Sequence, residues 1–252
     1  MKITLTVFVV CLTAMTSLGQ RAAPDKIPTS KGDLTIQPVM HAALMLQWNG
    51  QTIYVDPSGD AKAYAGLDDP DIVLITDVHG DHMSVETLEG LNTKSAVMVV
   101  PQAVADKLPE SYKERLMILG NGDETRIGEI SIRAIPMYNL PDDETSRHTK
   151  GRGNGYIVEM GGKRVYISGD TEDIPEMRRL KNIDVAFVCM NLPYTMDINQ
   201  AASAVLEFQP AIVYPYHYRG QGGLADVEGF KQLVDKGGKK IEVRLRNWYP
   251  GL

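Results

Sequence analysis

The chain has 252 residues but only two cysteines, Cys11 and Cys189. Cys11 lies in an N-terminal segment that we expect to be removed, so one thiol remains and a disulfide framework is excluded. Cys189 lies within the apolar run from Val185 to Met190, which predicts a buried and unreactive thiol. Catalysis by a cysteine nucleophile is therefore not expected.

Positive charge is also scarce. The chain has 26 Lys and Arg against 32 Asp and Glu, a net charge of −6, and no stripe of basic residues interleaved with aromatics, so a nucleic-acid partner is not expected. With 43% hydrophobic and 23% charged residues, a chain of this length can bury one full core. We expect a single domain that acts on a small molecule, with an oligomeric state that the sequence leaves open.

Long apolar runs are absent except near the N-terminus. Residues 3–18 follow the positive pair Met1-Lys2 and end in small residues before Gln20, which predicts a signal peptide over residues 1–19. A membrane anchor is the alternative, but the stretch is short and interrupted by hydroxyl residues. We therefore expect an exported, periplasmic mature domain over residues 20–252, without a stable membrane span after cleavage.

The mature chain reads as many short strands with a few helices. Short apolar runs bounded by turn residues predict strands at 34–39, 42–48, 52–55, 72–76, 96–100 and 129–135. Helices are predicted at 84–91, capped by the Ser84 hydroxyl, and at 102–108. Residues 139–154 are predicted to form a long polar loop.

The second half of the chain repeats the pattern of the first. A hairpin over 43–55 turns at Asn49-Gly50, and a similar hairpin over 155–168 turns at Gly161-Gly162. The apolar run at 71–77 has a counterpart at 184–190. Such similarity also arises by chance between hairpins. The pattern nevertheless predicts an α+β fold, an αββα sandwich of two β-sheets packed face to face with helices on both outer faces.

Potential metal ligands are concentrated in the segment Asp77-Val78-His79-Gly80-Asp81-His82. It contains two of the five histidines of the chain and directly follows the apolar strand at 72–76. Two imidazoles and two carboxylates thus lie at the C-terminal end of a strand, where α/β sheets usually place their chemistry.

Three further residues of metal-ligand type fall at predicted element ends. His148 lies on the loop before a strand, Asp170 follows Ser168-Gly169 at the end of a strand, and His217 follows the apolar run 211–214. Gly169 would allow the backbone to bring the Asp170 carboxylate into a crowded centre. This concentration of histidines and aspartates favours a metal site.

In this order the residues resemble the metallo-β-lactamase-fold hydrolases. That family has an HxHxDH loop after a strand, then a later His, a Gly-Asp at a strand end, and a final His. Here the order appears as Asp77-x-His79-x-Asp81-His82, His148, Asp170 and His217. The stretches from His41, at Tyr54-Val-Asp56-Pro57 and at Ile135-Pro-Met-Tyr138 are similar to the branch of ascorbate-6-phosphate lactonases and N-acyl-phosphatidylethanolamine phospholipases.

The resemblance implies two divalent metal ions. One would be held by Asp77, His79 and His148, the other by Asp81, His82 and His217, with Asp170 bridging them. Zn²⁺ is the expected metal, but Asp77 stands where the family has histidine. A carboxylate there makes Mn²⁺ or Fe²⁺ more competitive. Alternatively, Asp77 only orients His79 from outside the ligand set.

A two-metal centre would activate a bridging hydroxide and polarise a carbonyl or phosphoryl oxygen. The resemblance implies that Asp81 is catalytic, orienting the nucleophile and passing a proton to the leaving group. We therefore expect a metal-dependent hydrolase that cleaves an ester, lactone, amide or phosphodiester. The alternatives are a β-lactam hydrolase and a non-catalytic metal- or ligand-binding protein on the same fold.

Other residues have weaker signals. His41 and Tyr138 are predicted to line the substrate pocket, although a structural role is an open alternative for both. Asp56 is expected to support the metal loop rather than bind metal. The basic residues Arg147, Lys150 and Arg152 beside His148 either recognise an anionic group or belong to a solvated polar loop.

Overall fold

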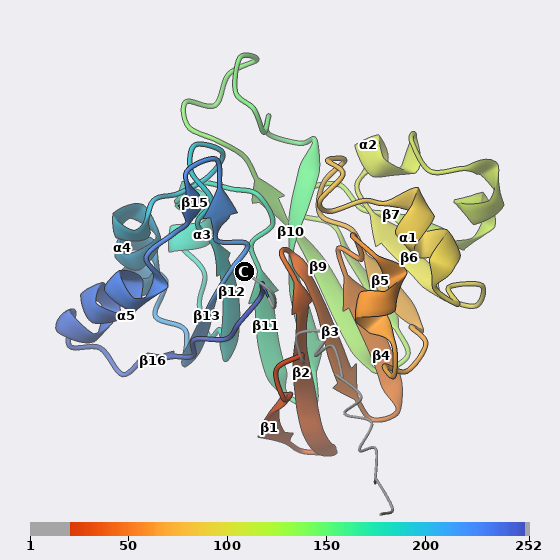
Figure 1. The fold of residues 1–252 in the computed structure, drawn as a ribbon, viewed down its shortest axis with the longest axis horizontal. Coiled ribbons are helices and arrows are strands. Elements are labelled where there is room, and N and C mark those ends of the chain that lie inside the picture. The colour runs from red at the N-terminus through yellow and green to blue at the C-terminus, as the bar shows by residue number, and fades with distance from the viewer. Residues whose placement is uncertain (1–20, 250–252) are drawn as a thin grey trace, which may run out of the picture.

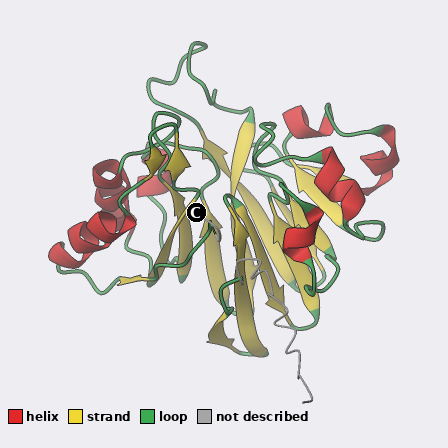
Figure 2. Cartoon of the chain, in the orientation of Figure 1, coloured by secondary structure: helices red, strands yellow, loops and turns green. Residues whose placement is uncertain are grey.

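Two β-sheets of seven strands each form the centre of the molecule, as the computed structural model of residues 21–249 shows (Figure 1). Helices lie on both outer sides of the pair of sheets (Figure 2). The predicted αββα sandwich is therefore confirmed. The predicted signal peptide, residues 1–19, lies outside the described residues.

The first sheet uses the N-terminal half of the described chain. Its strands follow the order of the sequence: β1 Asp25–Thr29, β2 Gly32–Met40, β3 Ala43–Trp48, β4 Gln51–Val55, β5 Ile72–Leu74, β6 Val97–Val100 and β7 Leu116–Ile118. Strands β1 to β4 form an antiparallel meander, whereas β4 to β7 are parallel.

The second sheet repeats this plan. Its strands are β8 Glu124–Ile127, β9 Ile130–Met137, β10 Gly153–Met160, β11 Lys163–Ile167, β12 Val185–Cys189, β13 Ile212–Tyr216 and β16 Glu242–Val243. Again an antiparallel meander, β8 to β11, is followed by parallel strands. The similarity between the hairpins at 43–55 and 155–168 thus corresponds to two sheets of the same topology.

Both hairpin turns have the backbone that their residues predict. Asn49 and Gly50 have φ of 50° and 75°, and Gly161 and Gly162 have φ of 57° and 76°. Two successive positive φ values give the turn a twist that matches the twist of the flanking strands, and Asn and Gly adopt them at low cost. Each hairpin therefore fixes the register of its two strands, β3 with β4 and β10 with β11.

The helices are short and divide between the two faces. They are α1 Val85–Gly90, α2 Gln102–Ala105, α3 Pro175–Arg178, α4 Ile198–Phe208 and α5 Val227–Lys236, with 3₁₀ helices η1 Ala61–Tyr64 and η2 Glu110–Arg115. Strands β14 Arg219–Gly220 and β15 Gly223–Leu224 form a separate small hairpin. Ser84 caps α1 as predicted, with its side chain accepting a hydrogen bond from the Thr87 N–H.

Successive side chains of a strand point to opposite faces of the sheet, and this explains why helices cover the outer faces of both sheets. In β3, Leu44 and Leu46 belong to the large core that the two sheets share. Ala43 and Met45 point the other way, into a smaller core with residues of α1 and α2. Because successive side chains of a strand point to opposite faces, a strand that is apolar on both faces must be covered on both. The helices supply the outer cover.

Several predicted bounds shift. The strand predicted at 72–76 ends at Leu74, and the helix predicted at 102–108 is assigned over Gln102–Ala105. The long loop ends at residue 152, because β10 begins at Gly153. Cys189 is fully buried, as predicted. Among residues 21–249, no helix is long and apolar enough to cross a membrane.

Candidate metal centre

The predicted ligands meet at one edge of the sandwich, at the ends of strands from both sheets. Residues 77–82 follow β5 of the first sheet, whereas Asp170 follows β11 and His217 follows β13 of the second. His148 lies on the loop between β9 and β10. The parallel strands of each sheet end at the same edge, so residues distant in sequence converge there.

Asp56 holds both ends of the 77–82 loop through hydrogen bonds to Thr76 and His82. Its Oδ1 accepts the Thr76 backbone N–H at 2.7 Å, and its Oδ2 accepts the Thr76 hydroxyl at 2.7 Å. His82 Nδ1 lies 2.8 Å from the same Oδ2. Because the carboxylate only accepts, the His82 hydrogen lies on Nδ1 and the lone pair of Nε2 points into the centre. The supporting role predicted for Asp56 is what the structure shows.

Gly169 lets the second sheet bring Asp170 into this crowded space. Its φ is 61°, and a Cβ built there would lie 2.5 Å from Met137 Sδ and 3.1 Å from Thr76 Cβ. A larger residue would push the two sheets apart at the site. Glycine at this position therefore has the steric reason that the sequence suggested.

Asp170 lies at the centre of the cluster. Its Oδ2 is 3.2 Å from His148 Nε2 and 3.4 Å from His82 Nε2, and its Oδ1 is 3.2 Å from His217 Nε2. The Nε2 atoms of His82 and His217 are only 3.1 Å apart. A single carboxylate thus faces three imidazoles, which come from both sheets.

The cluster divides into groups with metal-ligand spacing. Asp77, His79 and His148 each offer an atom within 4.8 Å of the others, and so do His82, Asp170 and His217. Asp81 joins the second group from its open side, with Oδ2 at 3.5 Å from His217 Nε2. A third group of the same spacing contains His41, Asp81 and His217. The structure thus brings all seven predicted residues to one place, and their assignment to two ions stays a prediction.

The residues present fit divalent cations. Three buried atoms, His148 Nε2, Asp170 Oδ1 and His217 Nδ1, have no hydrogen-bond partner among the described residues. His148 Nδ1 is 2.8 Å from Asn139 Oδ1, so its hydrogen lies there and Nε2 offers a lone pair. Buried polar atoms that lack partners are costly. His148 Nε2 and Asp170 Oδ1 face the cluster, and a cation there would satisfy these two atoms.

The electrostatics of the cluster point the same way. Burial raises the pKa of Asp170, but the charges of His217 and His82 and the close approach of the His148 and His82 rings outweigh it and hold that pKa well below its usual range. Burial lowers the pKa of His82, but Asp170 and Asp56 raise it well above the usual value. A field that favours a proton on a buried imidazole also favours a divalent cation.

Comparison with known proteins agrees with this geometry. The model of the beta-lactamase superfamily domain matches residues 35–217. The chain belongs to this superfamily. A UPF0173 metal-dependent hydrolase from Pyrococcus furiosus is 32% identical over 212 residues, which cover 80% of this chain and 92% of that relative. Another, from Pyrococcus horikoshii, is 32% identical over 213 residues, with 81% and 92% covered.

Solved structures give the same result. A candidate metal-dependent hydrolase from Parabacteroides distasonis is 37% identical, with a TM-score of 0.79 and coverage of 89% of this chain and 98% of that one. Igni18, a metallo hydrolase from Ignicoccus hospitalis, is 26% identical with a TM-score of 0.71 and coverage of 86% and 95%. The predictions of the metallo-β-lactamase fold and of a metal-dependent hydrolase are confirmed.

One part of this superfamily site is unusual. Asp77 is fully buried, and it accepts two hydrogen bonds from the guanidinium of Arg152, at 3.1 Å on Oδ1 and 2.9 Å on Oδ2. His79 Nδ1 lies 2.7 Å from Oδ2 as well. Burial raises the Asp77 pKa, but the hydrogen bond from His79 and the charges of His82, Arg152 and His79 together lower it to about 2. The carboxylate that replaces the family histidine is thus ionised and already paired.

His41 is placed beside the catalytic candidate Asp81. The Tyr249 hydroxyl accepts the Arg219 backbone N–H at 3.0 Å and lies 2.8 Å from His41 Nδ1, to which it donates. His41 therefore carries its hydrogen on Nε2 and donates to Asp81 Oδ2 at 3.1 Å. Burial lowers the pKa of His41 despite the Asp81 hydrogen bond, which agrees with a neutral ring that orients Asp81.

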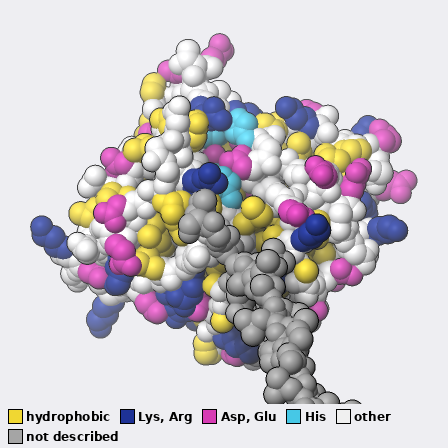
Figure 3. All heavy atoms as spheres, viewed as in Figure 1, with side chains coloured by type: hydrophobic (Ala, Val, Ile, Leu, Met, Phe, Trp, Pro, Cys, Tyr) yellow, Lys and Arg dark blue, Asp and Glu magenta, His cyan; other side chains and the backbone are white. Residues whose placement is uncertain are grey.

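The centre opens to the surface on this side. Figure 3 shows histidine side chains reaching the surface, with acidic side chains between them and basic ones beside them. The mouth is lined by His41, Asp81, Asn191, Tyr194, Arg219, Gly220 and Gln221.

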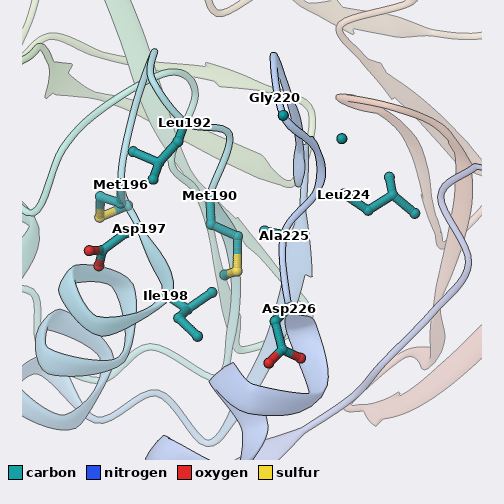
Figure 4. A pocket seen from close by; sticks show the side chains of 11 residues that line it. Met190, Leu192, Met196, Asp197, Ile198, Gly220, Leu224, Ala225 and Asp226 are labelled. Atoms are coloured by element: carbon teal, nitrogen blue, oxygen red, sulfur yellow. The ribbon is translucent and has the colours of Figure 1, made fainter.

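An apolar compartment of about 270 Å³ adjoins the mouth and shares Gly220 with it. Met190, Met196 and Ile198 face into it between the start of α4 and the β14–β15 hairpin (Figure 4). Its two carboxylates, Asp197 and Asp226, cap α4 and α5 and accept backbone N–H groups. The space therefore has a largely apolar wall.

Tyr138 does not join the mouth. It is buried, and its hydroxyl donates to Glu176 Oε2 at 2.9 Å. Lys150 also pairs with Glu176 at 2.9 Å and lies over the Tyr138 ring. The structure thus gives the Tyr138 side chain packing and hydrogen-bond partners of its own, and its contact with substrate stays a prediction.

The basic residues around His148 are not free to act together. Arg152 is bound to Asp77, Lys150 to Glu176, and Arg147 lies over the Tyr194 ring at 4.4 Å. Asn139, Arg219 and Tyr249 were not identified as site residues from the sequence. No local sequence pattern identifies them. Tyr249 contacts His41 from a distant part of the chain, Asn139 contacts His148 because their loop curves back, and Arg219 reaches the mouth from β14.

Proposed function

We propose that this chain is an exported hydrolase that holds two divalent cations and cleaves an ester, lactone, amide or phosphodiester bond of a small molecule. The observation that carries the proposal is the buried ring of imidazole nitrogens around the Asp170 carboxylate, with atoms that lack partners in the described structure. His79, His148 and Asp77 would hold one cation, and Asp81, His82 and His217 the other, with Asp170 between them.

Zn²⁺ is the cation proposed first, because imidazole and carboxylate ligands in small sets suit it. The extra carboxylate of Asp77 makes Mn²⁺ or Fe²⁺ the alternatives. Bound at such a site, divalent cations lower the pKa of water toward neutrality and stabilise negative charge on a carbonyl or phosphoryl oxygen.

The residues of the chain do the remaining work. The Asp81 side chain is 41% exposed at the mouth and is held by the His41 hydrogen bond, so one carboxylate oxygen can accept a hydrogen bond from water and orient it. The same oxygen can receive a proton and pass it to a leaving group. The apolar compartment beside the mouth supports a substrate with a carbon-rich group, such as a lactone or ester with an alkyl chain.

Chelation tests this proposal. We expect treatment with a chelator to abolish hydrolysis of lactone, carboxylic ester and bis-p-nitrophenyl phosphate substrates, and Zn²⁺ or Mn²⁺ to restore it. In a series of p-nitrophenyl esters, kcat/KM is expected to rise as the acyl chain lengthens from acetyl, by up to about 0.8 kcal/mol for each CH₂ group buried. A metal-loaded protein that hydrolyses none of these substrates would contradict the proposal.

Export is tested separately. Because the predicted signal peptide covers residues 1–19, we expect the mature chain to begin at Gln20 and to be released with the periplasmic contents. N-terminal sequencing of the fractionated native protein measures this. A chain that begins at Met1 in the cytoplasmic fraction would refute export without affecting the proposed chemistry.

A further inference from the structure

The ion pair between Asp77 and Arg152 is built into the metal centre. Both Asp77 oxygens accept from the guanidinium, through Nε and Nη2. The Asp77 side chain is fully buried and the Arg152 side chain is 22% exposed. Paired guanidinium hydrogen bonds of this kind fix both distance and orientation.

Arg152 is itself held in place. Its Nη1 donates to the Arg147 backbone oxygen at 2.6 Å, and its backbone N–H donates to the Thr149 oxygen at 3.2 Å. These contacts tie it to the loop that carries His148. The guanidinium is therefore a fixed positive charge in contact with a ligand group of the centre.

The two halves of the centre differ in charge as a result. In one half, Asp77 is balanced by Arg152. In the other, Asp81 and Asp170 have only histidine partners in their ion pairs among the described residues. Because Asp170 lies between the halves, the difference is that a cation meets Asp81 without a Lys or Arg partner on one side and the neutralised Asp77 on the other.

We propose that Arg152 is a positioning residue that makes the two halves of the centre bind divalent cations with unequal affinity. This inference rests on the proposed two-cation function. The half with Asp81, His82, His217 and Asp170 fills first. The half with Asp77, His79 and His148 binds at least about tenfold more weakly, a difference in the range that partners of ligand groups produce.

The Arg152 guanidinium competes with a cation for the Asp77 oxygens and repels it. The guanidinium occupies one lone pair on each Asp77 oxygen and repels a second positive ion at short range. Removing its charge would leave the buried Asp77 with only His79 as a partner, which destabilises the metal-free protein. A cation bound beside Asp77 would relieve that penalty, so its affinity should rise as the stability of the metal-free protein falls.

The test is a Co²⁺ titration of the metal-free protein by calorimetry and visible absorption. We expect two binding phases in the unsubstituted protein, separated at least tenfold in dissociation constant. Arg152→Met keeps the aliphatic stem but removes the charge, and it should tighten the weak phase at least tenfold while lowering the metal-free Tm. Arg152→Lys should retain the weak phase, and Asp77→Asn should remove it while leaving the tight phase.

Arg178→Met is the matched control. Arg178 is 23% exposed and pairs with Asp173, so its loss should lower Tm without changing either Co²⁺ phase. The inference would be overturned if the unsubstituted protein bound two Co²⁺ ions with equal affinity. It would also be overturned if the weak phase of Arg152→Met had the same dissociation constant as in the unsubstituted protein. Either result would leave the two-cation proposal standing. Failure of every variant to bind Co²⁺ would overturn both.

Discussion

Asp170→Ala is expected to abolish metal loading and turnover together. Among residues 21–249, Asp170 is the only carboxylate that lies within 3.4 Å of a ring nitrogen from each of His82, His148 and His217. Without it, the two groups of ligands would lose the carboxylate they share, and only Asp77 and Asp81 would remain as anionic groups. We expect kcat/KM to fall by at least about 1000-fold, more than the ~10–100-fold loss typical of removing a partner of a ligand.

The measurement pairs metal content with activity. Elemental analysis should find less than one ion per chain in Asp170→Ala after dialysis, and the substrate that the unsubstituted protein hydrolyses should react at the background rate. Asp170→Asn, which keeps the side-chain shape, is the folding control and should retain the circular dichroism of the unsubstituted protein. Full metal occupancy in either variant would refute the central position of Asp170.

Asp56→Asn is expected to weaken both the fold and metal binding, although Asp56 would touch no metal. The carboxylate accepts hydrogen bonds from the Thr76 backbone, the Thr76 hydroxyl and His82 in a fully buried position. An amide group would place N–H against one of these donors. We expect a loss of about 2–4 kcal/mol in unfolding free energy, because a buried charged acceptor is replaced.

Metal affinity should fall in the same variant by about 10–100-fold, since His82 would lose the group that fixes its ring and its proton. Urea denaturation and Zn²⁺ competition with a chromophoric chelator measure the two effects. Asp71→Asn is the control: Asp71 accepts the Thr52 backbone N–H at 2.8 Å beside the same sheet but outside the cluster. Unchanged Zn²⁺ affinity in Asp56→Asn would show that Asp56 supports the strand end alone.

Together these variants separate three kinds of contribution at the centre. On the proposed function, Asp170 would contribute as a ligand group shared by both halves, Asp56 as the anchor of one imidazole, and Arg152 as a charge that offsets one carboxylate. Each substitution should therefore change the stability of the protein, the number of bound metal ions and the turnover in a different combination. The patterns can be compared because all three residues act on the same cluster.

Much of the fold could be predicted from the sequence because its signals are local. The turns at Asn49-Gly50 and Gly161-Gly162, the apolar runs before Asp77 and Asp170, and the Ser84 cap each depend on neighbouring residues. Strand ends were less predictable. Val100 ends β6 as expected, but α2 ends three residues before the predicted position, because helix length depends on tertiary packing.

The sequence by itself determined which residues of metal-ligand type the chain has, their order and their places at element ends, and the family resemblance supplied their proposed grouping around two ions. Only the tertiary structure decided the partners: Arg152 on Asp77 across 75 positions, Asn139 beneath His148, and Tyr249 behind His41. Such pairs depend on how two sheets and their loops pack, and packing is set by many weak contacts at once. No short stretch of sequence contains that information.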